Sequence, residues 1–121
     1  MRTAVVGFIT AAICLTLLSG CTPAVSEGGF NAPDPGSKLY AIIRAGQTRD
    51  RTAIPHLIEQ LESDDQAVRM YSILALDRIT GTRLGYIHHA PSHHRQAAVA
   101  RWVEAYRTGE LEDDHAKAPQ P

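Results

Sequence analysis

The 121-residue sequence predicts an all-α fold, a small domain of about four helices. Apolar residues recur at i, i+3 and i+4 in successive segments, which is the spacing of one face of an α-helix. No segment alternates apolar and polar residues for long enough to predict a strand. Residues that typically cap or end helices separate the segments. Because most connections are short, we expect neighbouring helices to pack antiparallel.

The first two predicted helices occupy the region from residue 37 to residue 61. The first begins at Ser37, whose hydroxyl can cap it, and ends at Gly46. The second begins near residues 51–53, because Pro55 is tolerated only in the first turn of a helix. The apolar faces of the two helices consist of Leu39, Ile42, Ile43, Ile54, Leu57, Ile58 and Leu61.

The third predicted helix contains the longest periodic run of the chain, and the fourth follows it after a loop over residues 82–91. The residues Ser63-Asp64-Asp65-Gln66 can cap the third helix, and Ser63 and Gln66 can form a capping box there. Ser92 is expected to cap the fourth helix, which Gly109 ends. The two apolar stripes are Val68, Tyr71, Ser72, Ala75, Leu76 and Ile79, and then Ala98, Val99, Trp102, Val103 and Tyr106.

The N-terminal segment combines a positive charge, an apolar run and a cysteine. Arg2 precedes the apolar residues 4–18, which are fewer than the roughly 20 that a membrane-spanning helix needs. Small residues then lead to Cys21 in the sequence Leu18-Ser19-Gly20-Cys21. This arrangement resembles the signal peptide of bacterial lipoproteins. The resemblance implies cleavage before Cys21, a diacylglycerol on its sulfur and an acyl group on the new amino terminus.

The expected location is therefore the cell envelope, with the protein lipid-anchored to a membrane. Two or three acyl chains hold a small protein on a bilayer almost without exchange. In Gram-negative lipoproteins an aspartate after the cysteine commonly signals retention in the inner membrane. Thr22 stands there instead, which favours the periplasmic face of the outer membrane if the cell is Gram-negative. An ordinary secretory peptide and an uncleaved anchor are the alternatives.

Composition divides the rest of the chain and limits its partners. With the signal peptide over residues 1–20 removed, residues 21–36 predict the lipidated cysteine and a flexible linker, 37–109 the helical domain, and 110–121 a disordered acidic tail. The mature chain has 11 Lys and Arg against 13 Asp and Glu, which argues against nucleic acid as a partner. Cys14 is lost with the signal peptide, so no disulfide can form within the mature chain.

The second and third predicted helices carry a motif in two parts. Its residues are Ala53, Pro55, Leu57, Ile58 and Leu61, followed by Asp65, Val68, Arg69, Ala75 and Leu76. This pattern resembles a short bacterial HEAT repeat, which also occurs in phycobilin lyase-like repeat proteins. The resemblance covers residues 50–81 and implies a helical-repeat domain that serves as a recognition surface. It also implies that Arg69 contacts a carboxylate of a neighbouring turn, while Asp77 and Arg78 are expected to link helices.

Four histidines form the densest cluster of metal-ligating side chains: His88, His89, His93 and His94. This density is compatible with a Zn²⁺, Cu²⁺ or Ni²⁺ site. Pro91 prevents the four from sharing one helix face. The alternative is a polar loop with solvent-exposed imidazoles, and the repeat family asks for no metal there. Our primary expectation is that the protein has no cofactor.

The function that we expect is a membrane-tethered module that binds an envelope protein or peptide. Arg44, Arg49 and Arg51 are the expected contact patch, with a solvated turn as the alternative. An enzyme is not expected, because the sequence contains no Gly-x-Ser-x-Gly, His-Glu-x-x-His or phosphate-binding Gly-Lys-Ser/Thr motif. The alternative function is a metal-binding envelope lipoprotein that uses residues 88–94, and a lyase-like enzyme is a third possibility.

Overall fold

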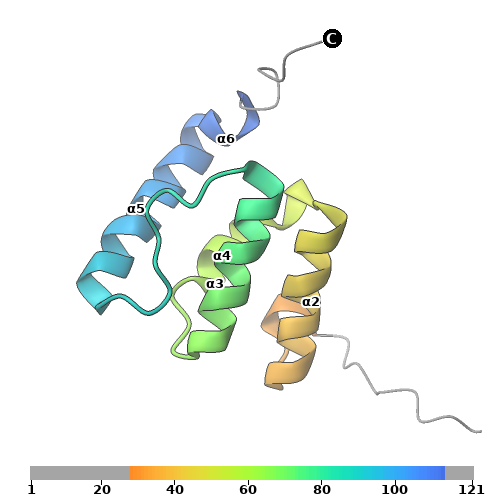
Figure 1. Ribbon diagram of the computed structural model, residues 1–121. Helices are drawn as coiled ribbons and strands as arrows, with labels where there is room; N and C mark the ends of the chain where they lie inside the picture. The colour runs from red at the N-terminus through yellow and green to blue at the C-terminus, as the bar shows by residue number, and fades with distance from the viewer. Residues whose placement is uncertain (1–27, 114–121) are drawn as a thin grey trace, which may run out of the picture.

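The computed structural model describes residues 28–113, and no strand occurs within this range. Two 3₁₀ turns, η1 (Gly29–Asn31) and η2 (Arg51–Ala53), precede the first two of its helices. The helices are α2 (Pro35–Thr48), α3 (Ile54–Gln60), α4 (Gln66–Thr80), α5 (Ser92–Thr108) and the short α6 (Glu110–Asp113), labelled as in Figure 1. The prediction of an all-helical domain is confirmed for this part of the chain.

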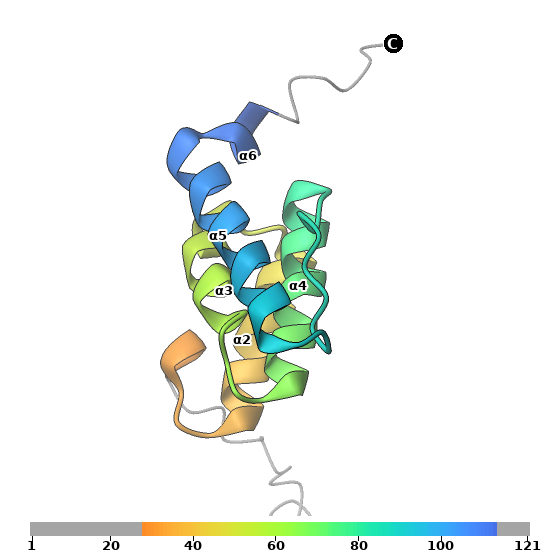
Figure 2. The same cartoon turned by 90° about the vertical axis from the view of Figure 1, so that its left-hand side faces the viewer.

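The direction of the helices differs from the prediction at one connection. In Figure 1, α2 and α4 run the same way, and α3 runs back in the opposite direction. The loop 82–91 then returns along the domain, so that α5 runs in the same direction as α4 and packs beside α3 (Figures 1 and 2). The expectation of antiparallel neighbours is therefore wrong for α4 and α5, because the extended loop between them crosses the length of the domain.

The described part of the predicted linker packs onto the helices. Ala32 is only 1% exposed. Phe30 of η1 stacks on His56 of α3 with ring centroids 5.3 Å apart and an interplanar angle of 13°. The folded domain therefore begins before the predicted boundary at residue 37, because the side chains of Phe30 and Ala32 pack against the helices. Residues 21–27 of the predicted linker lie outside the described range.

Both ends of α2 lie outside the predicted limits. Asp34 rather than Ser37 is the N-cap, and its Oδ2 accepts the Ser37 backbone N–H at 2.7 Å. Gly46 does not end the helix; α2 continues to a C-cap at Arg49, which adopts the left-handed conformation with φ 52°. Gly46 is instead needed for helix contact, because a Cβ atom there would lie 2.9 Å from the Cα of Ala75 in α4.

Aspartates also cap the following elements. Asp50 precedes η2, which leads directly into α3 and agrees with the predicted start of that helix. The Oδ1 of Asp65 accepts the Ala67 backbone N–H at 2.7 Å and caps α4. The predicted capping box is therefore wrong, and Ser63 accepts the Asp65 N–H at 3.2 Å instead. Gln66, the second residue of the predicted capping box, is the first residue of α4.

The last long helix begins and packs differently from the prediction. Pro91 is the N-cap of α5, and Ser92 is already its first residue. Val103 and Tyr106 are 51% and 47% exposed, so their expected burial was wrong. The contact stripe of α5 consists of small side chains around Trp102, and Val103 lies about 100° around the helix from Trp102. The buried residues of α5 are Ala98, Val99, Trp102 and Ala105.

The core lies where α2, α3, α4 and α5 meet, and it is filled by aliphatic side chains, the Trp102 indole and the ring of Tyr86 from the loop. Arg69, Ile73 and Thr80 of α4 are buried although they lie outside the predicted stripe, so that the buried face of this helix is wider than predicted. The largest side chains with less than 2% exposure are Trp102, Ile42, Leu57, Leu61, Ile73, Leu76 and Ile79.

The beginning of the predicted acidic tail belongs to the folded domain. Gly109 ends α5 in the left-handed conformation, as predicted, and α6 follows at once. Leu111 is 6% exposed, and its carbonyl oxygen accepts a hydrogen bond of 2.5 Å from Nη2 of Arg51. The first residues of the tail are thus held by apolar burial and one charged donor. Residues 114–121 lie outside the described range.

Candidate functional site

A groove of about 200 Å³ lies on the surface between α2 and α4, which we call the α2–α4 groove. The two helices approach closely at Gly46 and Ala75, both of which line the groove. On either side of this contact, longer side chains extend from the two helices. The remaining lining residues are Ile43 and Gln47 of α2, and Tyr71, Leu74 and Arg78 of α4.

Part of the groove is apolar and open to solvent. Leu74 is 37% exposed, although it is a large hydrophobic residue. Tyr40, one turn before Ile43 on α2, is 50% exposed. The sequence analysis did not select this surface as a site. The available signal was that Tyr40 and Leu74 are large and apolar but lie off the stripes assigned to the core.

The opposite end of the groove is polar and carries a positive charge. Within residues 28–113, neither Gln47 nor Arg78 makes a side-chain hydrogen bond or an ion pair. The neighbouring Asp77 is already engaged, because its Oδ2 lies 2.9 Å from Nε of Arg83. The expected link between helices is therefore wrong for both Asp77 and Arg78: Asp77 binds the following loop, and Arg78 lines the groove. The result is an apolar groove with an available guanidinium and amide at one end.

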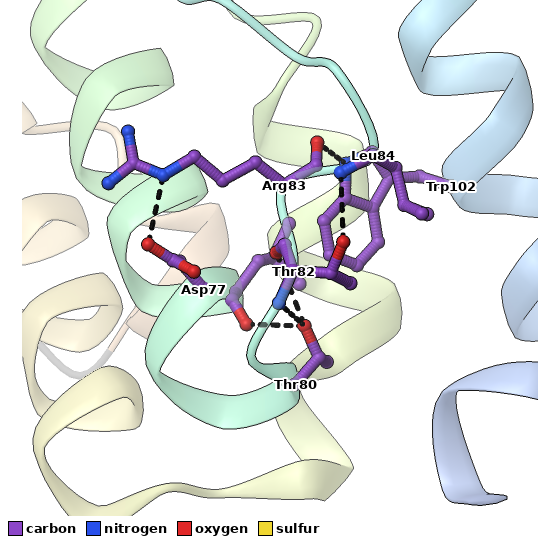
Figure 3. A network of polar contacts seen from close by, with 7 residues as sticks. Asp77, Thr80, Thr82, Arg83, Leu84 and Trp102 are labelled. Carbon is purple, nitrogen blue, oxygen red and sulfur yellow. Dashed lines mark hydrogen bonds and ion pairs between the residues drawn. The ribbon is translucent and has the colours of Figure 1, made fainter. Parts of the chain in front are cut away.

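The loop 82–91 has no helix or strand, but side chains hold its backbone in place. Figure 3 shows the beginning of the loop, where the Thr82 hydroxyl accepts the Leu84 N–H at 3.3 Å. In the same view the indole N–H of Trp102 donates to the Arg83 carbonyl oxygen at 3.1 Å. The Arg83 side chain points the other way, toward Asp77. The loop is thus fastened to both α4 and α5.

Arg69 of α4 holds the end of this loop. The residue is 8% exposed, and its guanidinium donates to the carbonyl oxygens of Ser63 at 2.7 Å, Asp64 at 2.8 Å and His88 at 3.1 Å. The expected contact with a carboxylate is wrong, because backbone carbonyls of the α3–α4 turn and of the loop surround the guanidinium. Arg69 therefore satisfies three partly buried carbonyl oxygens at once.

Two titratable side chains of the loop have shifted pKa values. Burial raises the pKa of Tyr86, and the positive charges of Arg69 and Arg95 oppose this shift to a smaller extent. The Tyr86 hydroxyl donates to the Leu61 carbonyl oxygen at 2.5 Å. Burial is also the main reason why the pKa of His88 is lowered, with further contributions from His89 and two arginines. Tyr86 is therefore a structural hydroxyl.

The four histidines form two neighbouring pairs. The ring centroids of His88 and His89 lie 4.8 Å apart, and those of His93 and His94 lie 4.4 Å apart. In the part of the chain that the structure describes, no group of three or more His, Cys, Asp or Glu is placed to hold a metal ion. A zinc site normally takes three or four protein ligands, so that neither pair alone is a complete site.

The structure separates the three arginines of the expected contact patch. Arg44 is exposed on α2, and Arg49 is exposed at the end of that helix. Arg51 is turned into the domain, where its Nη2 binds the Leu111 carbonyl oxygen. Its Nη1 is buried and has no hydrogen-bond partner among the described residues. Arg51 thus fixes the position of α6, and only Arg44 and Arg49 present their side chains to solvent.

The predicted lipidation site, Cys21, lies in the N-terminal segment outside the described range. None of the helices between residues 28 and 113 combines the length and the apolar character needed to cross a membrane.

The fold and the groove define a small all-α domain, over residues 28–113, with an apolar surface groove that ends at a positive charge. Comparisons with protein-family models, with curated proteins and with solved structures find no match for this chain. The resemblance to a HEAT repeat therefore rests on the motif residues quoted above.

Proposed function

We propose that the chain is an envelope lipoprotein whose helical domain, related to HEAT repeats, binds another protein or a peptide. The observation that carries this proposal is the α2–α4 groove, which presents apolar side chains on a rigid pair of helices. Lipid on Cys21 would hold the domain at a membrane, on the periplasmic face of the outer membrane if the cell is Gram-negative. The domain would then act as a scaffold for its partner.

The size of the groove favours a protein partner over a small metabolite. Pockets for drug-sized molecules usually have volumes of roughly 300–1,000 Å³. The α2–α4 groove measures about 200 Å³, which suits one or two side chains of a partner. Arg44 of α2 and Arg49, the C-cap of this helix, lie close in sequence to the groove residue Gln47 and would add positive charge near it. Such a surface is typical of helical-repeat domains, which serve more often for recognition than for catalysis.

The membrane tether can be tested with the two cysteines of the chain. We expect cells fed labelled palmitate to incorporate label into the wild-type protein and into Cys14→Ser, but not into Cys21→Ser. Cys14 is a matched control because it lies in the same segment and would be removed with the signal peptide. Label that persists in Cys21→Ser, or a wild-type protein that stays in the soluble fraction, would contradict the tether.

The binding function needs a separate test in intact membranes. Chemical cross-linking followed by mass spectrometry should identify one or a few partners of the wild-type protein. The double variant Arg44→Glu/Arg49→Glu should lose those cross-links, whereas Arg107→Glu on α5 should retain them. Arg107 is a suitable control because its side chain is 71% exposed and pairs with Glu104, an exposed ion pair that contributes little to stability. No reproducible cross-link to any partner would contradict the proposed function.

A further inference from the structure

We propose that the α2–α4 groove binds an amphipathic helix of a partner protein, which carries an Asp or Glu at the end that faces Arg78. This inference rests on the proposed protein-binding function and specifies the chemistry of the partner. Helices that lie in grooves insert apolar side chains spaced by one turn and are recognised mainly by those anchors.

The apolar part of the groove matches such anchors in length and shape. Tyr71, Leu74 and Arg78 follow one another at i, i+3 and i+7 on one side of α4. Seven residues of helix span about 10 Å, or two turns. A partner helix laid along this line can place two apolar side chains, one turn apart, between Ile43 on one wall and Tyr71 and Leu74 on the other. The groove volume of about 200 Å³ leaves room for about two side chains of the partner.

The charge of the groove indicates what lies beyond those anchors. The lining contains one cation and an amide but no carboxylate. Asp77, the nearest acidic residue in the sequence of α4, is held by Arg83. The Arg78 guanidinium and the Gln47 amide can therefore both donate to a carboxylate of the partner, which favours an acidic residue one turn beyond the apolar anchors.

A second copy of the chain is a less suitable occupant. In a two-fold symmetric dimer the same patch meets itself, so that two grooves, each with a cation and no carboxylate, would face one another. The described N-terminal segment does not cover the groove either. Its turn η1 contacts α2 and α3, and Figure 2 shows it on the α3 side of α2, away from α4.

The test uses the full chain in mild detergent and a set of synthetic, fluorescently labelled peptides. Each is an alanine-based helix of about 16 residues, long enough to retain helical structure, with two leucines one turn apart. A single glutamate is moved along the set, one position at a time, relative to the leucines. We expect saturable binding, measured by fluorescence anisotropy, that is tightest when the glutamate lies about one turn beyond the second leucine.

Variants of the groove should change this binding in a defined way. Leu74→Asp should weaken it at least about tenfold, because it places a carboxylate at the apolar anchor. Arg78→Glu should weaken it about tenfold as well, and a peptide with lysine in place of its glutamate should restore binding to this variant. Arg107→Glu is the control and should bind as wild type does. Circular dichroism would verify that each variant remains helical.

Three outcomes would each overturn the inference. The peptides could bind equally to wild type and to Leu74→Asp, the lysine peptide could fail to restore binding to Arg78→Glu, or no peptide of the set could bind with a dissociation constant below about 1 mM. A dimer that depends on Leu74, detected by sedimentation equilibrium, would also overturn it in favour of self-association. These failures are distinct from failure of the proposed function. Partner cross-links that survive in Leu74→Asp and in Arg78→Glu would leave the binding function intact and place it at another surface.

Discussion

The indole N–H of Trp102 donates to the carbonyl oxygen of Arg83 at 3.1 Å and so fastens the middle of α5 to the beginning of the loop 82–91. Trp102 is fully buried, and this bond satisfies its only polar group. One side chain therefore packs the core and holds a loop that has no regular structure of its own.

Replacing Trp102 should reduce stability more than any other single core substitution. We expect Trp102→Ala to lower the free energy of unfolding by about 3–5 kcal/mol, because it opens a cavity and removes the bond to the loop. For a domain of this size that is a large share of the total, which is about 5–15 kcal/mol. Urea unfolding followed by circular dichroism would measure it. Val103→Ala, at a neighbouring position that is 51% exposed, is the control and should change stability far less. Equal losses in the two variants would show that α5 is not part of the core.

The two glycines of α2 should respond differently to alanine. Alanine favours helix by up to about 1 kcal/mol relative to glycine. At Gly46 its Cβ would lie 2.9 Å from the Cα of Ala75, so that α2 and α4 must move apart, and we expect a net loss of about 1–3 kcal/mol. At Gly36 the nearest atom to the new Cβ would be Asp34 Oδ2 at 3.7 Å, so that alanine should raise the stability of the protein there. Melting temperatures would distinguish the two. A higher melting temperature for Gly46→Ala than for wild type would contradict the close packing of the helices.

Arg69 should be needed for the order of the loop as well as for stability. Arg69→Leu leaves three partly buried carbonyl oxygens without their charged donor, and we expect the free energy of unfolding to fall by about 2 kcal/mol. Arg69→Lys should recover only part of this, because an ammonium group cannot reproduce the planar fork of the guanidinium. Hydrogen exchange should show faster exchange in residues 82–91 of both variants. Arg44→Lys, at an exposed position, is the control, and exchange unchanged in Arg69→Leu would refute the role assigned to Arg69.

The buried Tyr86 should make stability fall in alkaline solution. Its pKa is raised in the folded state above the ordinary value of 10.0, so that folding disfavours the phenolate. The contribution of its neutral form is fully present below pH 10 and is lost as the pH rises above 10 toward the folded pKa, because the unfolded chain ionises first. Tyr86→Phe does not titrate at this position and should show a flatter decline over the same pH range. Parallel urea unfolding curves from pH 8 upward would test this, and identical pH profiles of the two proteins would contradict it.

Zinc binding tests the alternative reading of the histidine cluster. The described structure offers pairs of imidazoles and no set of three ligands, so we expect no heat when zinc is titrated calorimetrically into the full chain at micromolar concentration. A saturable signal that disappears in the double variant His88→Ala/His94→Ala would favour a metal-binding function instead. His56→Ala is the control, because His56 lies on α3, outside the histidine cluster.

Local sequence patterns were sufficient to predict that these residues form helices and roughly where. The start of α3 near Pro55 and the end of α5 at Gly109 were predicted correctly, because each depends on the backbone of one or two residues. The cap of α2 was misplaced by three positions, because Asp34 caps the helix in place of Ser37. The cap of α4 lies within the expected residues 63–66, but Asp65 provides it and the Ser63–Gln66 box does not form. Several neighbouring residues can each cap the same helix, and the local sequence does not show which of them does so.

The candidate site was not predictable in the same way. Periodicity shows which side chains share a helix face, but not what lies opposite that face. The groove requires Gly46 of α2 to meet Ala75 of α4, two residues that are far apart in the sequence. The direction of the Arg51 side chain, which points toward Leu111, likewise depends on where α6 packs against the domain.

By itself, the sequence determined the all-α class, the number of long helices and most of the residues in the core, because helix formation and burial follow the spacing of apolar residues along the chain. The tertiary structure alone decided the direction of α5, the exposure of Val103 and Tyr106, and the groove beside Leu74 and Arg78. Those features depend on contacts between distant segments, whose geometry is set by how closely the helices can approach one another.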